Sequence, residues 1–473
     1  MKVLYATSEA RPFAASGGLA DVAGSLPAAL RTRLIGCRVV LPLYESVPHE
    51  LREHMTFLGS LSVPVAWRRQ YCGVFEAKYN GVIYYLLDNQ YYFKRPGLYG
   101  HYDDAERFAF FSRAVLEMMD LIGFYPDILH ANDWQTALVP VYYSLFYANR
   151  PPYDRMKTVY TIHNIQYQGQ YGMEILGDVF GIPDSARSLV EQDGCINLMK
   201  GGIEAAHRVT TVSPSYAREL EDPWFAHGLD SIIRERSWKL CGILNGIDIK
   251  SYDPETDPEI PVHYSAAEPE GKAEDKAALL SSLGLSAPDG VPLISMVTRL
   301  ASHKGLDLVK YAFDQIMQLD VRMVVLGSGE WTFENFFREM QGRYPDRFCY
   351  CAGFIPELAR KIYAASDMFL MPSQSEPCGL SQMVACRYGA LPIVRETGGL
   401  RDSISDCGDG IGNGFTFKTY NADDMLYAIR RARELYREPE AWAGVRARAM
   451  ACDFSWGRSA NEYIRLYRSL LKE

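Results

Sequence analysis

The chain lacks several features that would place it in a class at once. Its 473 residues contain no apolar stretch close to the roughly 18 residues that cross a bilayer. The apolar start Met1–Ala6 gives way to Ser8 and Glu9, which is too short for a signal-peptide core. Lys+Arg 49 against Asp+Glu 58 gives a net charge of −9, without the basic excess of a nucleic-acid-binding protein. We therefore expect a cytoplasmic protein that binds neither membranes nor nucleic acid.

The ten cysteines also lack any metal-binding pattern. None forms a C-x-x-C pair, and the one close pair, Cys349 and Cys351, would point to the same side of a strand. This dispersion favours reduced, buried thiols over disulfides or a zinc site.

What the sequence does contain is a repeated strand–loop–helix pattern. Short β-branched runs are followed by Gly or polar residues and then by helical periodicity, which is typical of parallel sheets covered by helices. The length exceeds the roughly 250–300 residues that one core supports. We predict an α/β protein with two doubly wound, Rossmann-like domains facing a cleft, over residues 1–245 and 246–473. The polar run 253–272 is expected to be a surface connection.

Eleven strands are expected from this pattern, five in the first half and six in the second. They are Val3–Ala6, Asp127–Ala131, Thr158–His163, Val209–Ser213, Gly242–Leu244, Leu293–Thr298, Arg322–Leu326, Cys349–Ala352, Met368–Pro372, Leu391–Val394 and Phe415–Phe417. Ligands of such sheets bind at the carboxyl ends of the strands, so the residues that follow each strand are the candidates for a site.

In the first half, three segments after strands carry glycine or polar groups. Gly17 and Gly18 precede a helix, where a ligand can approach the backbone and meet free amides. Asn132-Asp133-Trp134 follows the second strand, and His163-Asn164 ends the third. A lone histidine is more often structural than functional, but two such clusters on neighbouring strands make the two interpretations about equal.

In the second half, the candidates are two cations and one acid. Arg299 ends a buried strand and Lys304 follows just before a helix, an arrangement that suits a diphosphate or, alternatively, a solvated surface pair. Glu376 lies in Ser373–Gln382, after another strand, and Thr397-Gly398-Gly399 forms a second paired-glycine helix entry.

The acidic pair Asp103-Asp104 resembles a metal-binding pair. Because it begins an amphipathic helix, helix capping is the favoured interpretation.

These segments together resemble the bacterial glycogen synthase and plant starch synthase family, retaining glycosyltransferases of the GT-B fold. The resemblance covers essentially the whole chain, and it depends on the order and spacing of several motifs. The strongest are Gly17–Val22, Asn132–Trp134, Lys200–Ile203, Thr211–Pro214, Asn245–Asp248, Glu376–Leu380 and Thr397–Leu400.

The resemblance implies transfer of glucose from ADP-glucose to the non-reducing end of an α-1,4-glucan, with retention and without a metal or cofactor. Fixed positive groups must then stabilise the departing diphosphate. The implied catalytic residues are His163, Arg299, Lys304 and Glu376. Donor-binding roles fall to Gly17, Gly18, Asp21, Asn245, Phe354 (as a base-stacking surface), Cys378, Gly379, Leu380, Thr397, Gly398 and Gly399, and acceptor-binding roles to Asp133 and Trp134. The resemblance also implies an acceptor side in residues 1–245, a nucleotide-sugar side in 246–473, and a last helix, about 455–473, that returns to the first domain.

One position departs from the family pattern. The lysine that precedes the first glycine pair in the family, and reaches the donor phosphates, is Ala15 here. Another cation such as Arg11 could compensate, the donor could differ, or the enzyme could be slow. This leaves open an alternative, a weakly active or inactive glucan-binding or priming paralogue.

Two further alternatives are less well supported by the residues. A nicotinamide-dependent oxidoreductase would carry G-x-G-x-x-G after its first strand, and this chain does not. A glucan phosphorylase fits the general fold and substrate but needs pyridoxal phosphate on a lysine.

Overall fold

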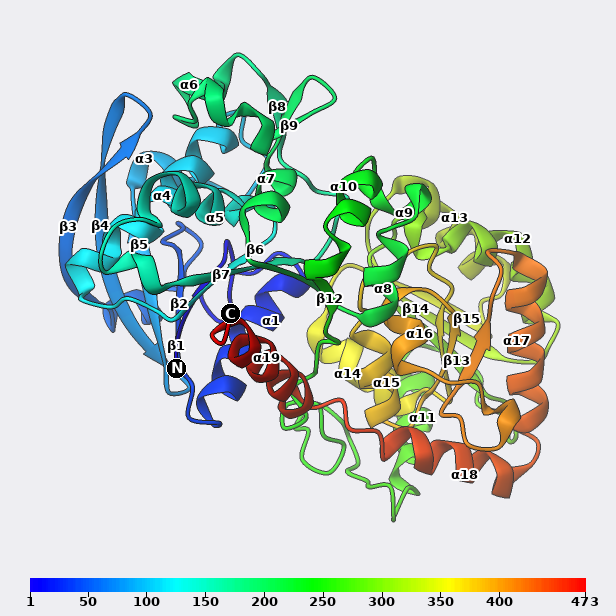
Figure 1. The fold of residues 1–473 in the computed structure, drawn as a ribbon. Helices are drawn as coiled ribbons and strands as arrows, with labels where there is room; N and C mark the ends of the chain where they lie inside the picture. Colours follow the sequence, from blue (N-terminus) through cyan, green and yellow to red (C-terminus); the bar gives the residue numbers. More distant parts are fainter. The chain divides into compact units, whose positions relative to one another are not determined.

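The computed structural model describes residues 1–473 as two compact units (Figure 1). Unit 1 comprises Met1–Asn245 and Trp456–Glu473, and unit 2 comprises Gly246–Ser455. The mixed α/β architecture that the sequence predicts is confirmed. None of the helices combines the length and the apolar character that a bilayer span requires.

Unit 1 is built on a nine-stranded sheet in the order β12-β11-β7-β6-β1-β2-β5-β4-β3. All neighbours from β12 to β5 run parallel, and β3 and β4 add an antiparallel edge. Its strands are β1 Lys2–Ala6, β2 Gly36–Pro42, β3 Thr56–Val65, β4 Arg68–Tyr79, β5 Val82–Asp88, β6 Ile128–Asn132, β7 Lys157–Ile162, β11 Arg208–Thr211 and β12 Leu240–Gly242. A small antiparallel sheet is formed by β8 Gln170–Gly172, β9 Glu191–Gln192 and β10 Cys195–Asn197.

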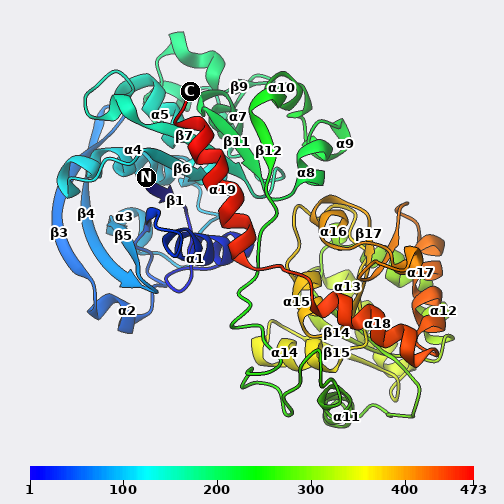
Figure 2. The ribbon, with the colours of Figure 1, turned by 60° about the horizontal axis from the view of Figure 1, so that its bottom comes forward.

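Most helices of unit 1 lie beside the large sheet, whereas α6 (Ile175–Asp178) contacts β8 of the small sheet (Figure 1). The helices of unit 1 are α1 Gly18–Arg31, α2 His49–Glu53, α3 Gln90–Phe93, α4 Asp104–Ile122, α5 Leu138–Tyr142, α6 Ile175–Asp178, α7 Leu198–Ala205, α8 Pro214–Glu219, α9 Pro223–Ala226, α10 Asp230–Glu235 and α19 Trp456–Leu470. Helix α19 packs against α1 (Figure 2), and Tyr467 Oη lies 2.7 Å from His130 Nδ1 in the interior.

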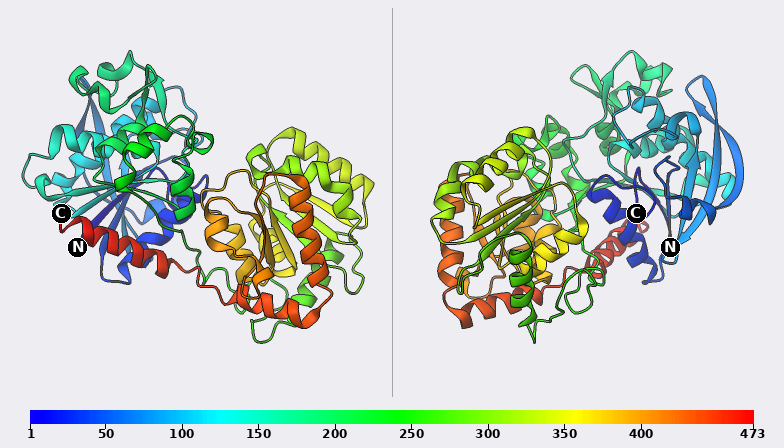
Figure 3. Two further views of the ribbon diagram at one scale, coloured as in Figure 1. Left: turned by 45° about the vertical axis from the view of Figure 1, so that its right-hand side comes forward. Right: turned by 180° about the vertical axis from the view of Figure 1, so that it is seen from behind.

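Unit 2 holds a fully parallel six-stranded sheet in the order β15-β14-β13-β16-β17-β18, with helices on both faces (Figure 3). Its strands are β13 Leu293–Val297, β14 Arg322–Gly327, β15 Phe348–Ala352, β16 Met368–Met371, β17 Leu391–Arg395 and β18 Phe415–Phe417. Its helices are α11 Gly271–Ser282, α12 Leu306–Met317, α13 Trp331–Arg343, α14 Pro356–Ala365, α15 Ser381–Arg387, α16 Gly398–Ser403, α17 Ala422–Leu435 and α18 Pro439–Met450.

All eleven predicted strands are present, although the fifth lies at Leu240–Gly242 rather than Gly242–Leu244. The sequence did not indicate β2 to β5, nor the small sheet. The run 253–272 contains no strand, but it is not merely a surface connection, because Asp257 and Tyr264 are buried and α11 already begins at Gly271.

The structure confirms the position that the capping interpretation gives Asp103-Asp104, at the start of α4, but shows no capping hydrogen bond. Asp103 is the N-cap residue of α4, yet its side chain makes no capping hydrogen bond. It pairs with Arg95 at 2.6 Å, and Asp104 pairs with the fully buried Arg107 at 2.6 Å. Both carboxylates are therefore held by arginines.

Candidate active site

The candidate site of unit 1 lies where the strand order reverses. From β1 the chain builds outward through β2 on one side, and returns through β6 and β7 on the other. Such a switch point leaves an opening at the carboxyl ends of the strands. Here β1 is followed by Glu9, β6 ends at Asn132 and Asp133 follows, and β7 is followed by His163. The structure thus brings together two of the predicted site residues, Asp133 and His163.

Glu9 organises the first glycine turn. Its buried carboxylate accepts hydrogen bonds from the N–H of Ser16, from Ser16 Oγ at 3.1 Å and from the N–H of Gly17 at 3.3 Å. Burial raises the pKa of Glu9. A side chain built on Gly17 or Gly18 would meet no atom within 4 Å, so a ligand has room to approach this backbone.

His163 is fixed by a network at the end of β7. Its Nε2 lies 2.9 Å from Asn132 Oδ1, which also accepts the Tyr5 hydroxyl at 2.8 Å. Because that amide oxygen can only accept, Nε2 carries the hydrogen. Burial lowers the pKa of His163 to about 3, so the imidazole is neutral at pH 7. A neutral, oriented imidazole can hydrogen-bond a sugar hydroxyl without adding charge.

Asp133 is held in a strained backbone conformation, with φ at 56°. Such strain is a feature of functional sites. Its Oδ1 accepts the N–H groups of His163 at 2.7 Å and Asn164 at 3.4 Å, and burial raises its pKa to about 7. The neighbouring Trp134 packs edge-on against Phe108, with ring centroids 5.1 Å apart, so it forms a fixed apolar wall.

Two further predicted residues of unit 1 lie apart from this network. Asp21, in the first turn of α1, forms an ion pair with Arg11 in which Oδ1 and Nε are 2.5 Å apart. Asn245 is buried, and its Oδ1 has no hydrogen-bond partner within the protein. An unpaired buried amide oxygen is costly unless a ligand hydroxyl satisfies it.

The candidate site of unit 2 also lies at a switch point, between β13 and β16. Lys304, after β13, places Nζ 2.6 Å from Oε2 of Glu376, after β16. Ser373 Oγ donates to the same oxygen at 3.1 Å. Arg299 is exposed and forms no ion pair. Its charge acts on the pKa of His303, as do the charges of Lys304 and Glu376, so all three side chains lie near His303. The structure therefore brings the three predicted residues of this half into one neighbourhood.

The second glycine pair supports the backbone of the Glu376 loop. A Cβ on Gly398 would lie 2.0 Å from the carbonyl oxygen of Glu376, and one on Gly399 would lie 2.1 Å from that of Cys378. The N–H of Gly399 also donates to the Glu376 carbonyl at 3.1 Å. Gly398 and Gly399, together with the fully buried Thr397, therefore position the Glu376 loop.

The remaining predicted residues of unit 2 present backbone groups and one aromatic ring. Gly379 has a φ of +68°, which favours glycine, and the N–H groups of Gly379 and Leu380 have no acceptor within the protein. Cys378 is buried. Phe354, after β15, is 78% exposed, which leaves its ring face open for stacking.

Sequence reasoning missed Glu9, although its place directly after the first strand, at a switch point, is a usable signal. His130, which lies in the same strand as Asn132, has a structural role. Its two ring nitrogens contact Tyr467 and Thr161, and burial lowers its pKa to about 3. No group of three or more His, Cys, Asp or Glu side chains is arranged to hold a metal ion.

Comparison with known proteins adds an independent line of observation. Residues 2–235 match the family model described as the starch synthase catalytic domain, and residues 284–444 match glycosyl transferases group 1. A glycogen synthase of Geobacillus thermodenitrificans is 50% identical over 477 residues, covering 100% of this chain and 98% of that protein. A glycogen synthase of Desulforamulus reducens is 48% identical, covering 100% of this chain and 99% of its own length.

Solved structures show the same relationship. The catalytic domain of starch synthase IV from Arabidopsis thaliana, bound to ADP and acarbose, has a TM-score of 0.92 and 35% identity, covering 100% of this chain and 99% of that one. A sucrose-phosphate synthase from Thermosynechococcus elongatus has a TM-score of 0.64 and 17% identity, which shows similarity of fold alone.

Proposed function

The chain belongs to the glycogen synthase and starch synthase family of GT-B glycosyltransferases, and we propose that it is a glycogen synthase that uses ADP-glucose. It transfers glucose to the non-reducing end of an α-1,4-glucan with retention of configuration. About half of all residues, over the full length, are identical to those of the two Geobacillus glycogen synthases. This identity favours an active enzyme over a glucan-binding paralogue without activity.

The observation that carries the proposal is the pairing of Lys304 with Glu376 at the switch point of unit 2. In the free protein, the ammonium neutralises the carboxylate. When the donor binds, Lys304 and the exposed Arg299 stabilise the negative charge that develops on the departing diphosphate. Glu376 is then released to bind glucose hydroxyls and to stabilise the positive charge on the sugar ring.

Backbone and aromatic groups complete the donor site of unit 2. The N–H groups of Cys378, Gly379 and Leu380 bind the donor, with Thr397, Gly398 and Gly399 supporting them. Phe354 stacks on the base. No metal is required in this scheme, because side-chain cations and backbone amides supply the positive potential.

Unit 1 contributes the groups that orient the two sugars. Gly17, Gly18, Asp21 and Asn245 bind the donor, and Asp133 and Trp134 bind the glucan. Neutral His163, whose Nε2–H is held by Asn132, accepts a hydrogen bond at Nδ1 from a hydroxyl of the transferred glucose. Its backbone carbonyl faces the anomeric carbon, where it stabilises the positive charge that develops during transfer.

The test is a transfer assay with purified protein, glycogen and a panel of ADP-, UDP- and GDP-glucose, run with and without excess chelator. Release of ADP and lengthening of glucan chains from ADP-glucose, unchanged by chelator, is the expected result. No turnover with any nucleotide-glucose would contradict the proposal. Turnover with glucose 1-phosphate instead, together with a bound pyridoxal chromophore, would identify a phosphorylase.

A further inference from the structure

Cys349 and Cys351 form a close dithiol on β15. All ten cysteines of the chain are free thiols, and the Sγ atoms of these two lie 3.8 Å apart in hydrogen-bond contact. Residues two apart on a strand point to the same face, so the pair projects from one side of the sheet. Strand β15 is one of the two edge strands of the sheet in unit 2.

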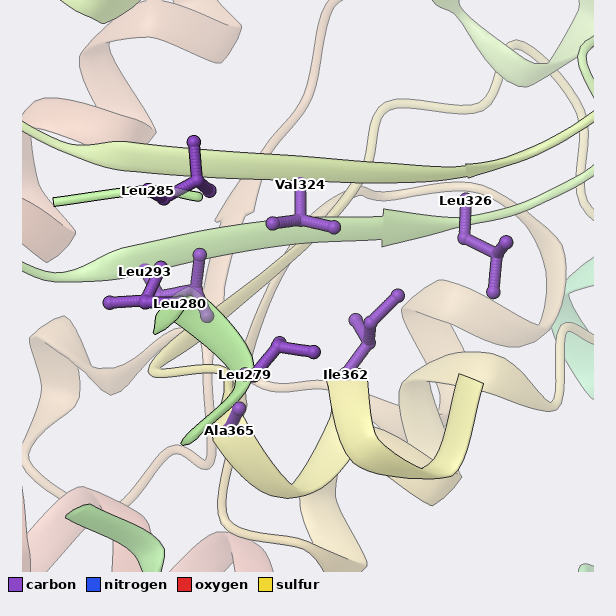
Figure 4. Close-up of a cluster of buried hydrophobic side chains, with 8 residues drawn as sticks. All are labelled: Leu279, Leu280, Leu285, Leu293, Val324, Leu326, Ile362 and Ala365. Atoms are coloured by element: carbon purple, nitrogen blue, oxygen red, sulfur yellow. The ribbon is translucent and has the colours of Figure 1, made fainter. Parts of the chain in front are cut away.

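The surroundings keep the pair half-buried. Both side chains pack against the apolar cluster that α11 and α14 form with β13 and β14, whose members are drawn in Figure 4. Both also retain part of their solvent exposure. A small, uncharged oxidant can therefore reach the sulfurs.

The two thiols are not equivalent. A hydrogen bond from Cys351 lowers the pKa of Cys349, and the same interaction raises the pKa of Cys351. The thiolate is the reactive form of cysteine, so Cys349 is the nucleophile of the pair. A reactive, accessible thiol beside a second thiol is the arrangement found in redox-sensing sites.

We propose that Cys349 and Cys351 are a peroxide-reactive modification site in which Cys349 is oxidised first and Cys351 closes a disulfide. The Cys349 thiolate attacks hydrogen peroxide to give a sulfenic acid and hydroxide. The Cys351 thiol then displaces the sulfenic hydroxyl, which leaves as water after taking up the thiol proton. In sum, two thiols and one hydrogen peroxide give one disulfide and two waters.

Closing the disulfide requires local movement of β15. The sulfurs must approach from 3.8 Å to about 2.05 Å, and an extended strand must pucker to allow this. Strand β15 pairs with β14 alone, through Cys349 opposite Val324 and Cys351 opposite Leu326, so only one ladder has to yield.

The consequence for activity rests on the proposed function. Three residues after Cys351 comes Phe354, the base-stacking residue of that proposal, and Gly353 between them has a φ of +108°. Puckering of β15 displaces this loop. The disulfide therefore weakens binding of the nucleotide sugar.

The experiment treats the reduced, full-length protein with hydrogen peroxide and digests it with trypsin. Both cysteines fall in one peptide, 348–360, between Arg347 and Arg360. We expect this peptide to lose two hydrogen atoms and to regain them with dithiothreitol. In parallel, KM for ADP-glucose should rise about fivefold or more, the lower end of what loss of one base–aromatic stack costs, and return on reduction.

Single variants separate the two roles. Cys351→Ser should stop at a sulfenic acid on Cys349 that dimedone traps, whereas Cys349→Ser should yield no trapped Cys351. Cys195→Ser, which removes an exposed thiol in unit 1, is the matched control and should keep the full response.

A peptide that keeps its hydrogens, or a disulfide that leaves KM unchanged, overturns the proposal. Failure of the proposed function is seen separately, as absence of turnover by the reduced protein with every nucleotide-glucose, whereas the peptide mass reports the thiol chemistry alone.

Discussion

Replacing Arg11 tests most directly whether another cation binds the donor phosphates in place of the family lysine, which is Ala15 here. It is the only basic residue from Thr7 to Leu30, the segment that contains the first glycine turn. Its backbone N–H donates to the Ala20 carbonyl at 3.1 Å, and its guanidinium pairs with Asp21. We predict that this guanidinium binds a donor phosphate and that Arg11→Ala lowers kcat/KM.

The magnitude follows from the exposure of the ion pair. The side chains of Arg11 and Asp21 are 54% and 42% exposed, and such a surface pair stabilises the protein by only about 0–1 kcal/mol. Release from Asp21 therefore costs little. A charge-assisted bond to a phosphate contributes about 1.5–3 kcal/mol, so the net loss is about 0.5–3 kcal/mol. That corresponds to a roughly two- to 150-fold decrease in kcat/KM.

The assay is initial-rate ADP release at several ADP-glucose concentrations for Arg11→Ala, Ala15→Lys and the double variant. If Arg11 supplies the missing cation, Ala15→Lys should rescue Arg11→Ala to within a few-fold of the parent rate. Arg187→Ala, which removes another exposed, ion-paired arginine of unit 1, is the control and should leave the rate unchanged. A normal kcat/KM in Arg11→Ala would refute the reasoning.

Three further predictions concern the two candidate sites. Lys304→Met should lower kcat/KM at least about hundredfold. It should also lower the free energy of unfolding by up to about 3 kcal/mol, because it leaves the buried Glu376 carboxylate without its ion-pair partner. Adding Glu376→Gln should restore the melting temperature but not the activity, and recovery of activity would contradict the assigned roles. Burial raises the pKa of Asp133 from 3.8 to about 7, so the folded state holds a proton that the unfolded chain releases, and this group destabilises the fold as pH rises from about 4 to 7. Asp133→Asn should therefore gain in melting temperature over the parent from pH 5 to 7, with a constant difference above pH 7; a difference that does not change with pH would exclude a raised pKa. Phe354→Ala should raise KM for ADP-glucose about fivefold or more with kcat nearly unchanged, whereas Phe354→Tyr should retain it, and equal effects of both would argue against stacking.

Most strands of the parallel sheets were predictable because they are buried on both faces, although β2 and β5, which are also largely buried, were not indicated. A strand such as β13 reads as a continuous apolar run, Leu293-Ile294-Ser295-Met296-Val297, which stands out from its polar flanks. The candidate site residues of each half were proposed for the same reason, since several of them directly follow such runs.

The antiparallel edge of unit 1 was not predictable in this way. Strand β3, Thr56–Val65, is largely exposed along its length, and β4 mixes charged, aromatic and apolar residues. Neither matches a buried-strand pattern, because their stability comes from pairing with each other and with β5. The interaction of Asp103 could not be predicted either, because its carboxylate binds Arg95 rather than the free N–H groups of its own helix.

The discontinuity of unit 1 has a consequence for how the protein forms in the cell. Helix α19 is made after unit 2, yet its Tyr463, Tyr467 and Leu470 are all buried in unit 1 together with Met1–Asn245. During synthesis, Met1–Asn245 therefore leave the ribosome before the helix that covers part of their surface has been made. The intervening unit can complete its own core first, so the half of the enzyme that is made earliest is finished last.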